Sequence, residues 1–356
     1  MPRFLYLDVG TLKFLLAVVW PMSAADFCGP IRSLVRNESQ KQNIPAISVT
    51  IVQNNKIVCS IARGWADLEQ RVPNTIKSRH RLASLSKPIA AVLTMKLVEE
   101  GRLVLDDSIR RVLPELPARY EAVTIRRLLS HQSGIREYAG VDEVFSTTHY
   151  MNLGEAARSI FVDSALLFEP GTQTAYTTYG YTLLGAALER ATGQSFKQVL
   201  ETRIRGFTLD ELMTVVPDRV RPYRKNSAMA WENAPAFDAS NKYAGGGIVS
   251  SADDYASFLI HLASGLLRKD SLTTMWTQQK LANGSVVPYA TLGWATGVRN
   301  NHRFFTHGGL QPGTTTVMHW FPDLGVGSIV LSNAEGPDLD GLQGRLLEVV
   351  LGRRQQ

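Results

Sequence analysis

A serine and a lysine three positions apart stand out within residues 81–91 of this 356-residue chain. Ser84 and Lys87 precede an apolar, periodic run that Gly101 closes, which predicts a helix with Pro88 in its first turn. Side chains three apart share a helix face, so Lys87 could take the hydroxyl proton of Ser84. Free N–H groups at the helix start could then stabilise an anion. The pair predicts a nucleophile and its base; a capping serine and an exposed lysine are the alternative.

A tyrosine that could carry a proton lies farther along the chain. Tyr176 follows a Pro170-Gly171 turn and comes just before an apolar, periodic stretch at 179–192 that predicts another helix. Side chains on such loops usually meet solvent or a cleft, and a phenol there could pass a proton between nucleophile and leaving group. Taken alone, Tyr176 would more readily be a packing tyrosine.

A histidine and two glycines end a late strand pattern. His307, Gly308 and Gly309 are followed by Leu310. Glycines within a strand indicate close approach by a ligand or by another chain segment, and a substrate could pair along such an edge. The Leu310 amide could then complete an oxyanion hole with the Ser84 amide. A surface histidine is the alternative for His307 when it is considered alone.

These three motifs occur in the order of a known family. Two further stretches match it: Leu128–Gly134 fits Leu-Leu-x-His-x-Ser-Gly, and Ala244–Ser251 fits Gly-Gly-x-x-Ser-Thr. Residues 30–350 therefore resemble the penicillin-recognising serine hydrolases. These comprise class C β-lactamases, serine D-Ala-D-Ala carboxypeptidases of the penicillin-binding-protein type and β-lactamase-like esterases.

The resemblance implies roles for matching positions. Ser84 would be the acylated nucleophile and Lys87 its base partner, while Tyr176 would be the proton shuttle. The amides of Ser84 and Leu310 would form the oxyanion hole, and His307 would occupy the position of the lysine in the family's Lys-Thr-Gly. Which of the lysine and the tyrosine acts as the acylation base stays open. The resemblance implies no cofactor and no metal.

Two departures from the family pattern bear on the substrate. The family's Tyr-x-Asn is here Tyr176-Thr177-Thr178, so Thr178 occupies the substrate-binding position of an amide that usually holds the penicillin side chain. His307 replaces a permanent cation that would pair with the β-lactam carboxylate, which a neutral imidazole does poorly. The Tyr-x-Thr pattern resembles the serine β-lactamase-like peptidase of mitochondria. Peptide or ester hydrolysis is therefore favoured over penicillin resistance.

The elements that must hold these residues are strands at both ends of the chain and helices between them. The patterns predict one antiparallel sheet built from distant segments, flanked by helices, in an α/β (α+β) architecture. A mostly helical subdomain, residues 88–240, is inserted in it, and the resemblance implies a β-lactamase/transpeptidase-like fold. Within the insert we expect a helix over 196–209 and a long surface excursion over 215–243. Elsewhere we expect a hairpin at 45–62. Further helices are expected at 30–42, 108–112, 123–129, 250 onward and 339–351.

Composition excludes several function classes. The net charge of +6 is spread thinly, with no basic cluster interleaved with aromatics, so a nucleic-acid partner is not expected. The absence of Gly-x-Ser-x-Gly argues against an α/β-hydrolase. Six other histidines share no metal-like spacing, and we expect His131 to hold a loop near the site. These are His80, His131, His149, His261, His302 and His319.

The first 25 residues resemble a secretory signal. Arg3 and Lys13 lie ahead of an apolar run at 14–20, and small residues end at Ala25. The run is too short to span a bilayer, so we expect a hydrolase domain of residues 26–356 that is secreted or periplasmic and has no stable membrane span. Cys28 and Cys59 could form one disulfide in such a compartment, and the sequence leaves this open. The sequons at Asn37 and Asn283 matter only in a eukaryotic secretory pathway.

Together these features predict an exported serine hydrolase that forms an acyl-enzyme on Ser84 and cleaves a peptide or a small ester or amide. A class C-type β-lactamase or D-Ala-D-Ala carboxypeptidase is the alternative within the same chemistry. A non-catalytic relative that binds peptides or assembles with itself is the alternative from another class. The expected partner is a small-molecule or peptide substrate, and the oligomeric state stays open.

Overall fold

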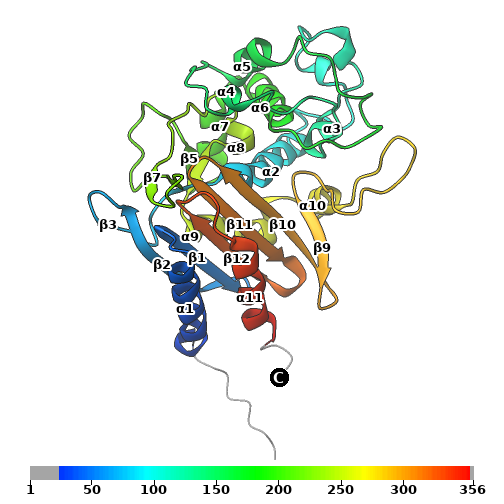
Figure 1. The fold of residues 1–356 in the computed structure, drawn as a ribbon. Coiled ribbons are helices and arrows are strands. Elements are labelled where there is room, and N and C mark those ends of the chain that lie inside the picture. Colours follow the sequence, from blue (N-terminus) through cyan, green and yellow to red (C-terminus); the bar gives the residue numbers. More distant parts are fainter. Residues whose placement is uncertain (1–23, 353–356) are drawn as a thin grey trace, which may run out of the picture.

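The two ends of the chain meet in one seven-stranded sheet of order β3-β2-β1-β12-β11-β10-β9 (Figure 1). The computed structural model describes residues 24–352, so the expected signal sequence lies almost entirely outside the described residues. Every neighbouring pair is antiparallel, and β1 lies directly against β12. The strands are β1 (Ala46–Gln53), β2 (Lys56–Asp67), β3 (Val72–Pro73), β9 (Ala295–Arg299), β10 (His302–Gln311), β11 (Thr314–Phe321) and β12 (Val326–Ser332). The prediction of one antiparallel sheet from distant segments is confirmed.

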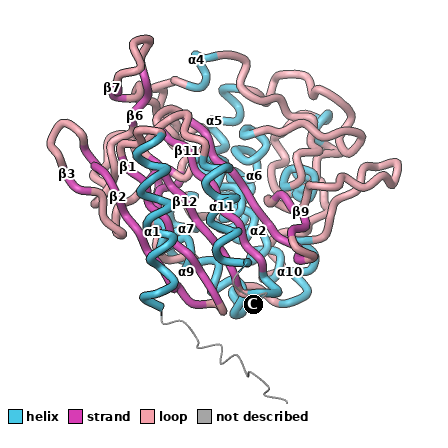
Figure 2. Tube along the Cα trace, turned by 60° about the horizontal axis from the view of Figure 1, so that its bottom comes forward, coloured by secondary structure: helices cyan, strands magenta, loops and turns pink. Residues whose placement is uncertain are grey.

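The central strands are covered on both faces, which explains their nearly continuous apolar sequences. All seven residues of β12 and the first seven of β1 are buried. Figure 2 shows α1 (Ala24–Lys41) and α11 (Leu339–Gly352) lying side by side over one face. The opposite face packs against α9 (Ala252–His261) and the larger core that surrounds α2 (Ser86–Glu99). The sheet is therefore the middle of three layers.

The region between β2 and β9 carries most of the remaining helices, and most of these lie beyond one end of the sheet (Figure 1). They are α3 (Ile125–Leu129), α4 (Val141–Val144), α5 (Leu153–Ile160), α6 (Thr178–Thr192), α7 (Phe196–Arg203), α8 (Tyr243–Gly246) and α10 (Lys269–Trp276). Two small sheets accompany them, made of β4 (His80–Arg81), β8 (Ile248–Ser250) and β5 (Phe207–Leu209), and of β6 (Tyr223–Lys225) and β7 (Trp231–Asn233).

Three local predictions were wrong. The helix expected over 196–209 ends at Arg203, and residues 207–209 instead form β5, which pairs with β8. The helix expected at 108–112 is a single 3-10 turn. The stretch 215–243 is not a surface excursion throughout, because Phe237 is 1% exposed and Lys242 is 3% exposed.

A disulfide joins Cys28 on α1 to Cys59 on β2, and the two cysteines are 31 positions apart in sequence. It fastens the first described helix to the sheet that the helix covers. Among residues 24–352, none of the helices combines the length and apolar character that crossing a bilayer requires.

Candidate active site

Ser84 lies in a 3-10 turn, η1 (Ala83–Leu85), that leads directly into α2. Ser84, the predicted nucleophile, thus lies two residues before the regular helix begins, and Lys87 is the second residue of α2. Lys87 Nζ donates a hydrogen bond to Ser84 Oγ at 3.0 Å. The short spacing thus brings the amine to the hydroxyl, as the sequence analysis expects.

Lys87 is completely buried, so its ammonium group depends on protein acceptors. Nζ donates to the carbonyl oxygen of Gly245 at 2.8 Å and lies 3.4 Å from the hydroxyl of Thr178. Gly245 belongs to the one-turn helix α8, and sequence reasoning assigned it no role. The feature of the sequence that could have indicated a role for Gly245 is the run of three glycines. A Cβ at Gly245 would clash with Thr178 and Tyr181.

Tyr176 reaches the same oxygen from a different element. Its hydroxyl donates to Ser84 Oγ at 2.6 Å, and its ring lies 4.6 Å from Lys87 Nζ. Its side chain is half-exposed, whereas Lys87 is enclosed. The hydroxyl of Ser84 therefore has two proton carriers, one facing the interior and one facing the cleft.

His131 holds the loop that carries Tyr176. Its Nδ1 accepts a hydrogen bond from the Thr177 N–H at 3.2 Å, and its carbonyl accepts one from the Ala175 N–H at 2.9 Å. Its ring also packs on the Tyr176 ring at 4.5 Å. Burial, and then the charge of Lys87, lower the pKa of His131 well below its ordinary value, so the ring is a neutral acceptor. His131 is a positioning residue.

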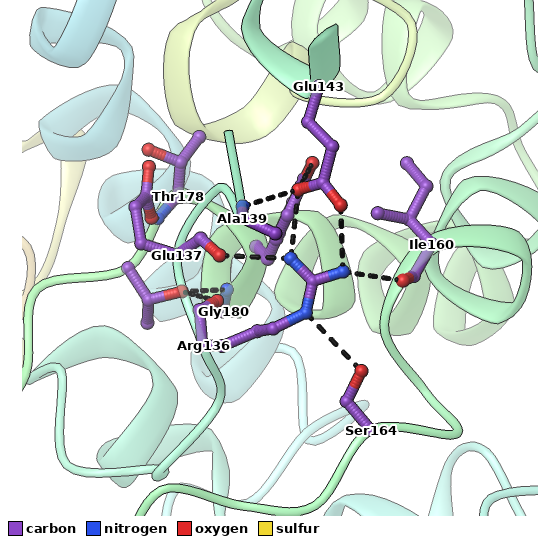
Figure 3. Close-up of polar contacts among 10 residues, drawn as sticks. Arg136, Glu137, Ala139, Glu143, Ile160, Ser164, Thr178 and Gly180 are labelled. Carbon is purple, nitrogen blue, oxygen red and sulfur yellow. Dashed lines mark hydrogen bonds and ion pairs between the residues drawn. The ribbon is translucent and has the colours of Figure 1, made fainter. Parts of the chain in front are cut away.

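The N-terminus of α6 follows Tyr176 and is fixed by polar contacts. Thr177 caps the helix: its Oγ1 accepts from the Gly180 N–H at 3.1 Å and donates to the Arg136 carbonyl at 2.9 Å. The carboxylate of Glu137 accepts the N–H of Thr178 (Figure 3). A carboxylate at a helix N-terminus is electrostatically favourable.

Arg136 is the centre of this network, which Figure 3 shows. Its guanidinium makes two bonds to Glu143, at 2.8 and 2.9 Å, and others to the Ile160 carbonyl and to Ser164. Hydrogen bonding to Glu143 raises the pKa of Arg136. Sequence reasoning missed Arg136, Glu137 and Glu143, because their partners come from other segments and no short motif marks them.

Strand β10 forms the opposite wall. β9 pairs with β10 only as far as Thr306, so the following residues have no strand partner on that side within the described sheet. Gly308 is exposed there, and a Cβ on it would find only the Thr316 carbonyl, at 3.8 Å. The side chain of Leu310 is 66% exposed. This edge has room for a substrate chain.

Gly309 serves a different purpose from Gly308. A Cβ on Gly309 would lie 2.5 Å from the Leu82 carbonyl oxygen and 3.0 Å from the Ala83 Cβ. Ala83 has φ of 48°, a left-handed conformation that is costly for a residue with a side chain. The backbone just before Ser84 therefore packs directly against Gly309, the residue before Leu310. An oxyanion hole formed by the Ser84 and Leu310 amides needs these two segments to be neighbours.

His307 lies on the wall and does not bond Ser84 in this structure. Its Nδ1 is 2.6 Å from the Gly308 carbonyl oxygen, and its ring centre is 6.4 Å from that of Tyr176. Desolvation, with repulsion from Lys87, lowers the pKa of His307 to about 4. The position that carries a lysine in many relatives is thus uncharged at neutral pH.

The cleft in front of Ser84 has a volume of about 570 Å³ and is lined in part by Ser84, Tyr176 and 307–310. Of the residues predicted from the sequence, Lys87 and Thr178 do not line this cleft: Lys87 is buried behind Ser84, and Thr178 is buried next to Lys87 rather than facing a substrate. Within residues 24–352, no three His, Cys, Asp or Glu side chains gather as a metal site.

Comparisons with known proteins identify relatives of the chain. Human mitochondrial serine β-lactamase-like protein LACTB is 27% identical over 335 residues, which cover 69% of this chain and 61% of that protein. The match thus spans about three fifths of the human protein. The protein flp of Staphylococcus aureus (strain COL) is 30% identical over 175 residues, covering 48% of this chain and 34% of its own length.

Solved structures show the same fold. The octameric penicillin-binding protein homologue of Pyrococcus abyssi superposes with a TM-score of 0.78 at 23% identity, covering 91% of this chain and 77% of its own. D-amino acid amidase of Ochrobactrum anthropi SV3, in complex with L-phenylalanine, gives 0.78 at 21% identity, covering 91% and 99%. The β-lactamase family model matches residues 31–351. With this match, and with Ser84, Lys87 and Tyr176 assembled in one site, the chain belongs to the β-lactamase family.

Proposed function

We propose that this protein is a serine hydrolase that forms an acyl-enzyme on Ser84 and cleaves a peptide or a small ester or amide. One observation carries the proposal: Ser84 Oγ lies 3.0 Å from Lys87 Nζ and 2.6 Å from the Tyr176 hydroxyl. Acyl transfer needs a base that takes the proton of the nucleophile and an acid that protonates the leaving group, and the two partners of Ser84 can supply both.

The proposed reaction has two halves. Ser84 Oγ attacks the substrate carbonyl, gives its proton to Lys87 or Tyr176, and the amides of Ser84 and Leu310 hold the oxyanion. The bond to the leaving group then breaks, and Tyr176 passes a proton to the departing nitrogen or oxygen. Water next attacks the acyl-enzyme with the same residues acting in reverse, which releases the acid and restores Ser84.

A class C-type β-lactamase or D-Ala-D-Ala carboxypeptidase is the second candidate. Those substrates carry a carboxylate, and the neutral state of His307 disfavours it. The same fold carries an amidase in Ochrobactrum anthropi, which supports amide chemistry on this scaffold. A non-catalytic binding protein is the third candidate, and the intact set of Ser84, Lys87 and Tyr176 disfavours it.

Export is a separate part of the proposal. The Cys28–Cys59 disulfide supports an oxidising compartment, and the charged and apolar pattern of residues 3–20 supports a cleaved signal. Intact mass of the protein recovered from an expressing cell should show loss of the residues up to Ala25. A chain that keeps its first 25 residues would contradict a cleaved signal.

Labelling with a fluorophosphonate probe, followed by intact-protein mass, tests the chemistry. We expect one adduct on the parent protein and none on a folded Ser84→Ala variant. Penicillin pre-treatment separates the candidates: a stable penicillin adduct that blocks the probe would indicate a penicillin-binding protein. Unchanged labelling would favour the peptidase or esterase, and no adduct on folded parent protein would refute the serine hydrolase.

A further inference from the structure

A second pocket, of about 290 Å³, opens beside the cleft that contains Ser84. Tyr176, His307 and Gly308 line both spaces, so these three residues form the partition between them. Ser84, Gly309 and Leu310 line the cleft but not the pocket. The pocket is thus on the side of the phenol and the histidine, away from the amides proposed to hold the oxyanion.

The walls of the pocket carry no formal charge at neutral pH. Leu129, Tyr289 and Trp294 are among the residues that line it. Of the lining residues, all within the described part of the chain, none is Lys, Arg, Asp or Glu. Its two histidines are both neutral at this pH, because burial lowers the pKa of His307 to about 4 and that of His131 well below its usual range.

Lys87, the cation beside Tyr176, does not serve the pocket. Lys87 Nζ lies behind the Tyr176 ring, 4.6 Å from its centre, and does not line the pocket. Its hydrogen bonds go to Ser84 Oγ and to the Gly245 carbonyl oxygen. A substrate carboxylate placed in the pocket would therefore lose its water without gaining an ionic partner, which is costly.

The position of Tyr176 decides which part of a substrate enters the pocket. When the bond to the leaving group breaks, the departing nitrogen or oxygen must receive a proton, and the Tyr176 hydroxyl is the carrier that faces the cleft. The leaving group must therefore pass next to Tyr176, and the pocket begins there. A cavity of about 150 Å³ already accepts benzene, so this volume suffices for an aromatic or branched aliphatic group.

We infer that this pocket holds the leaving group, and that the substrates are amides or esters whose leaving part is apolar and uncharged. The inference rests on the proposed function and narrows it. A peptide cut internally, or an ester of an apolar alcohol, meets this condition. A chain cut next to its free C-terminal carboxylate does not.

Two esters with one acyl group test the charge requirement. Methyl 3-acetoxybenzoate and 3-acetoxybenzoate release phenols of similar size, one neutral and one anionic. With rates corrected for alkaline hydrolysis of each ester, we expect kcat/KM to favour the neutral ester by about tenfold or more, the scale of one desolvated group. Equal rates, or cleavage of neither ester, would overturn the inference.

A variant pair tests the location. Ala295→Phe on β9 would fill the pocket, and Val298→Phe places the same ring on the same strand at a position that is 70% exposed and outside the pocket. We expect Ala295→Phe to lower kcat/KM for the neutral aryl ester at least about tenfold while fluorophosphonate labelling, whose leaving group is only fluoride, is retained. Val298→Phe should match the parent.

Failure of this inference is distinguishable from failure of the proposed function. Parent protein that takes no fluorophosphonate adduct would refute the serine hydrolase itself. Protein that is labelled on Ser84 but is indifferent to ester charge and to Ala295→Phe would leave the hydrolase standing and would refute the leaving-group pocket.

Discussion

Ser84 has two hydrogen-bonded partners that differ in their surroundings. Lys87 is enclosed and held by Gly245, while Tyr176 is 49% exposed and faces both the cleft and the pocket. An enclosed amine is suited to keep the serine oriented, and an exposed phenol is suited to meet the leaving group. Their tasks can therefore be separated by substitution.

Tyr176→Phe removes the hydroxyl and keeps the ring contacts to His131 and Lys87, at 4.5 and 4.6 Å. We expect kcat to fall about 100-fold or more, the usual contribution of a positioned acid or base, with little change in Tm. Steady-state kinetics and thermal unfolding on the same preparation measure both. An unchanged kcat would assign all proton transfer to Lys87.

The Ser84–Lys87 contact could be predicted from the sequence because it is local: three residues along a helical stretch bring two side chains together. Tyr176 could be placed only through its resemblance to a family pattern, since no local rule joins it to Ser84. Gly245, Arg136 and Glu137 escaped prediction because only tertiary packing brings them to the site.

Between elements, the critical contact is the one between β10 and the turn that carries Ser84. Gly309 has no room for a methyl group, because Leu82 and Ala83 fill that space, while Gly308 has room. The two glycines are adjacent and chemically identical, so they form a matched pair.

Gly309→Ala should push η1 away from β10 and misplace Ser84 relative to Leu310. We expect a loss of at least about 100-fold in the rate of fluorophosphonate labelling, the size of losing one oxyanion donor. Gly308→Ala should remain labelled at close to the parent rate. If both variants label alike, the contact at Gly309 does not position the nucleophile.

Prediction at the scale of elements succeeded for long, patterned segments. β1, β11 and β12 are buried strands rich in branched residues, and their limits are close to the strands that the sequence pattern predicts at 45–52, 314–320 and 326–332. β5 was missed because three residues carry no periodicity, and only pairing with β8 makes them a strand. Lys242 was expected at the surface, but it is buried against Phe237 and the Val144 carbonyl, a partnership between distant segments.

Across the whole molecule, the Cys28–Cys59 disulfide ties α1 to the sheet. The cross-link stabilises the folded protein because it lowers the conformational entropy of the unfolded chain. The double variant Cys28→Ser, Cys59→Ser should therefore have a free energy of unfolding about 2–4 kcal/mol lower than the parent. The cross-link joins α1 to the sheet within one hydrophobic core, whereas Ser84 leads into α2 in the other core, so kcat at 25 °C should be unchanged in the folded double variant. Denaturant unfolding measures the loss. Equal stability of the two proteins would mean that the cross-link adds nothing to α1 packing.

Stability should also depend on acid through His80, which lies in β4 just before the nucleophile turn. The ring is completely buried, its Nε2 is 3.0 Å from Ser48 Oγ on β1, and burial lowers its pKa to about 4. In the unfolded chain a histidine has a pKa of about 6.5. Between these values the unfolded state binds the extra proton, so the free energy of unfolding must fall as the pH falls from about 6.5 to 4.

For His80 alone the loss is on the order of 3 kcal/mol, and His131, His307 and His319, whose pKa values burial also lowers, should add to it. Denaturant unfolding from pH 7 to 4.5 measures the slope. His80→Gln should cost stability at pH 7 yet flatten the slope, whereas His261→Gln, at an exposed position on α9, should leave the slope as in the parent. Because the readout is the slope, it stays informative even if His80→Gln is weakly folded at every pH. An unchanged slope in His80→Gln would mean that protonation of other groups causes the loss of stability in acid, and that His80 in β4 does not contribute to it.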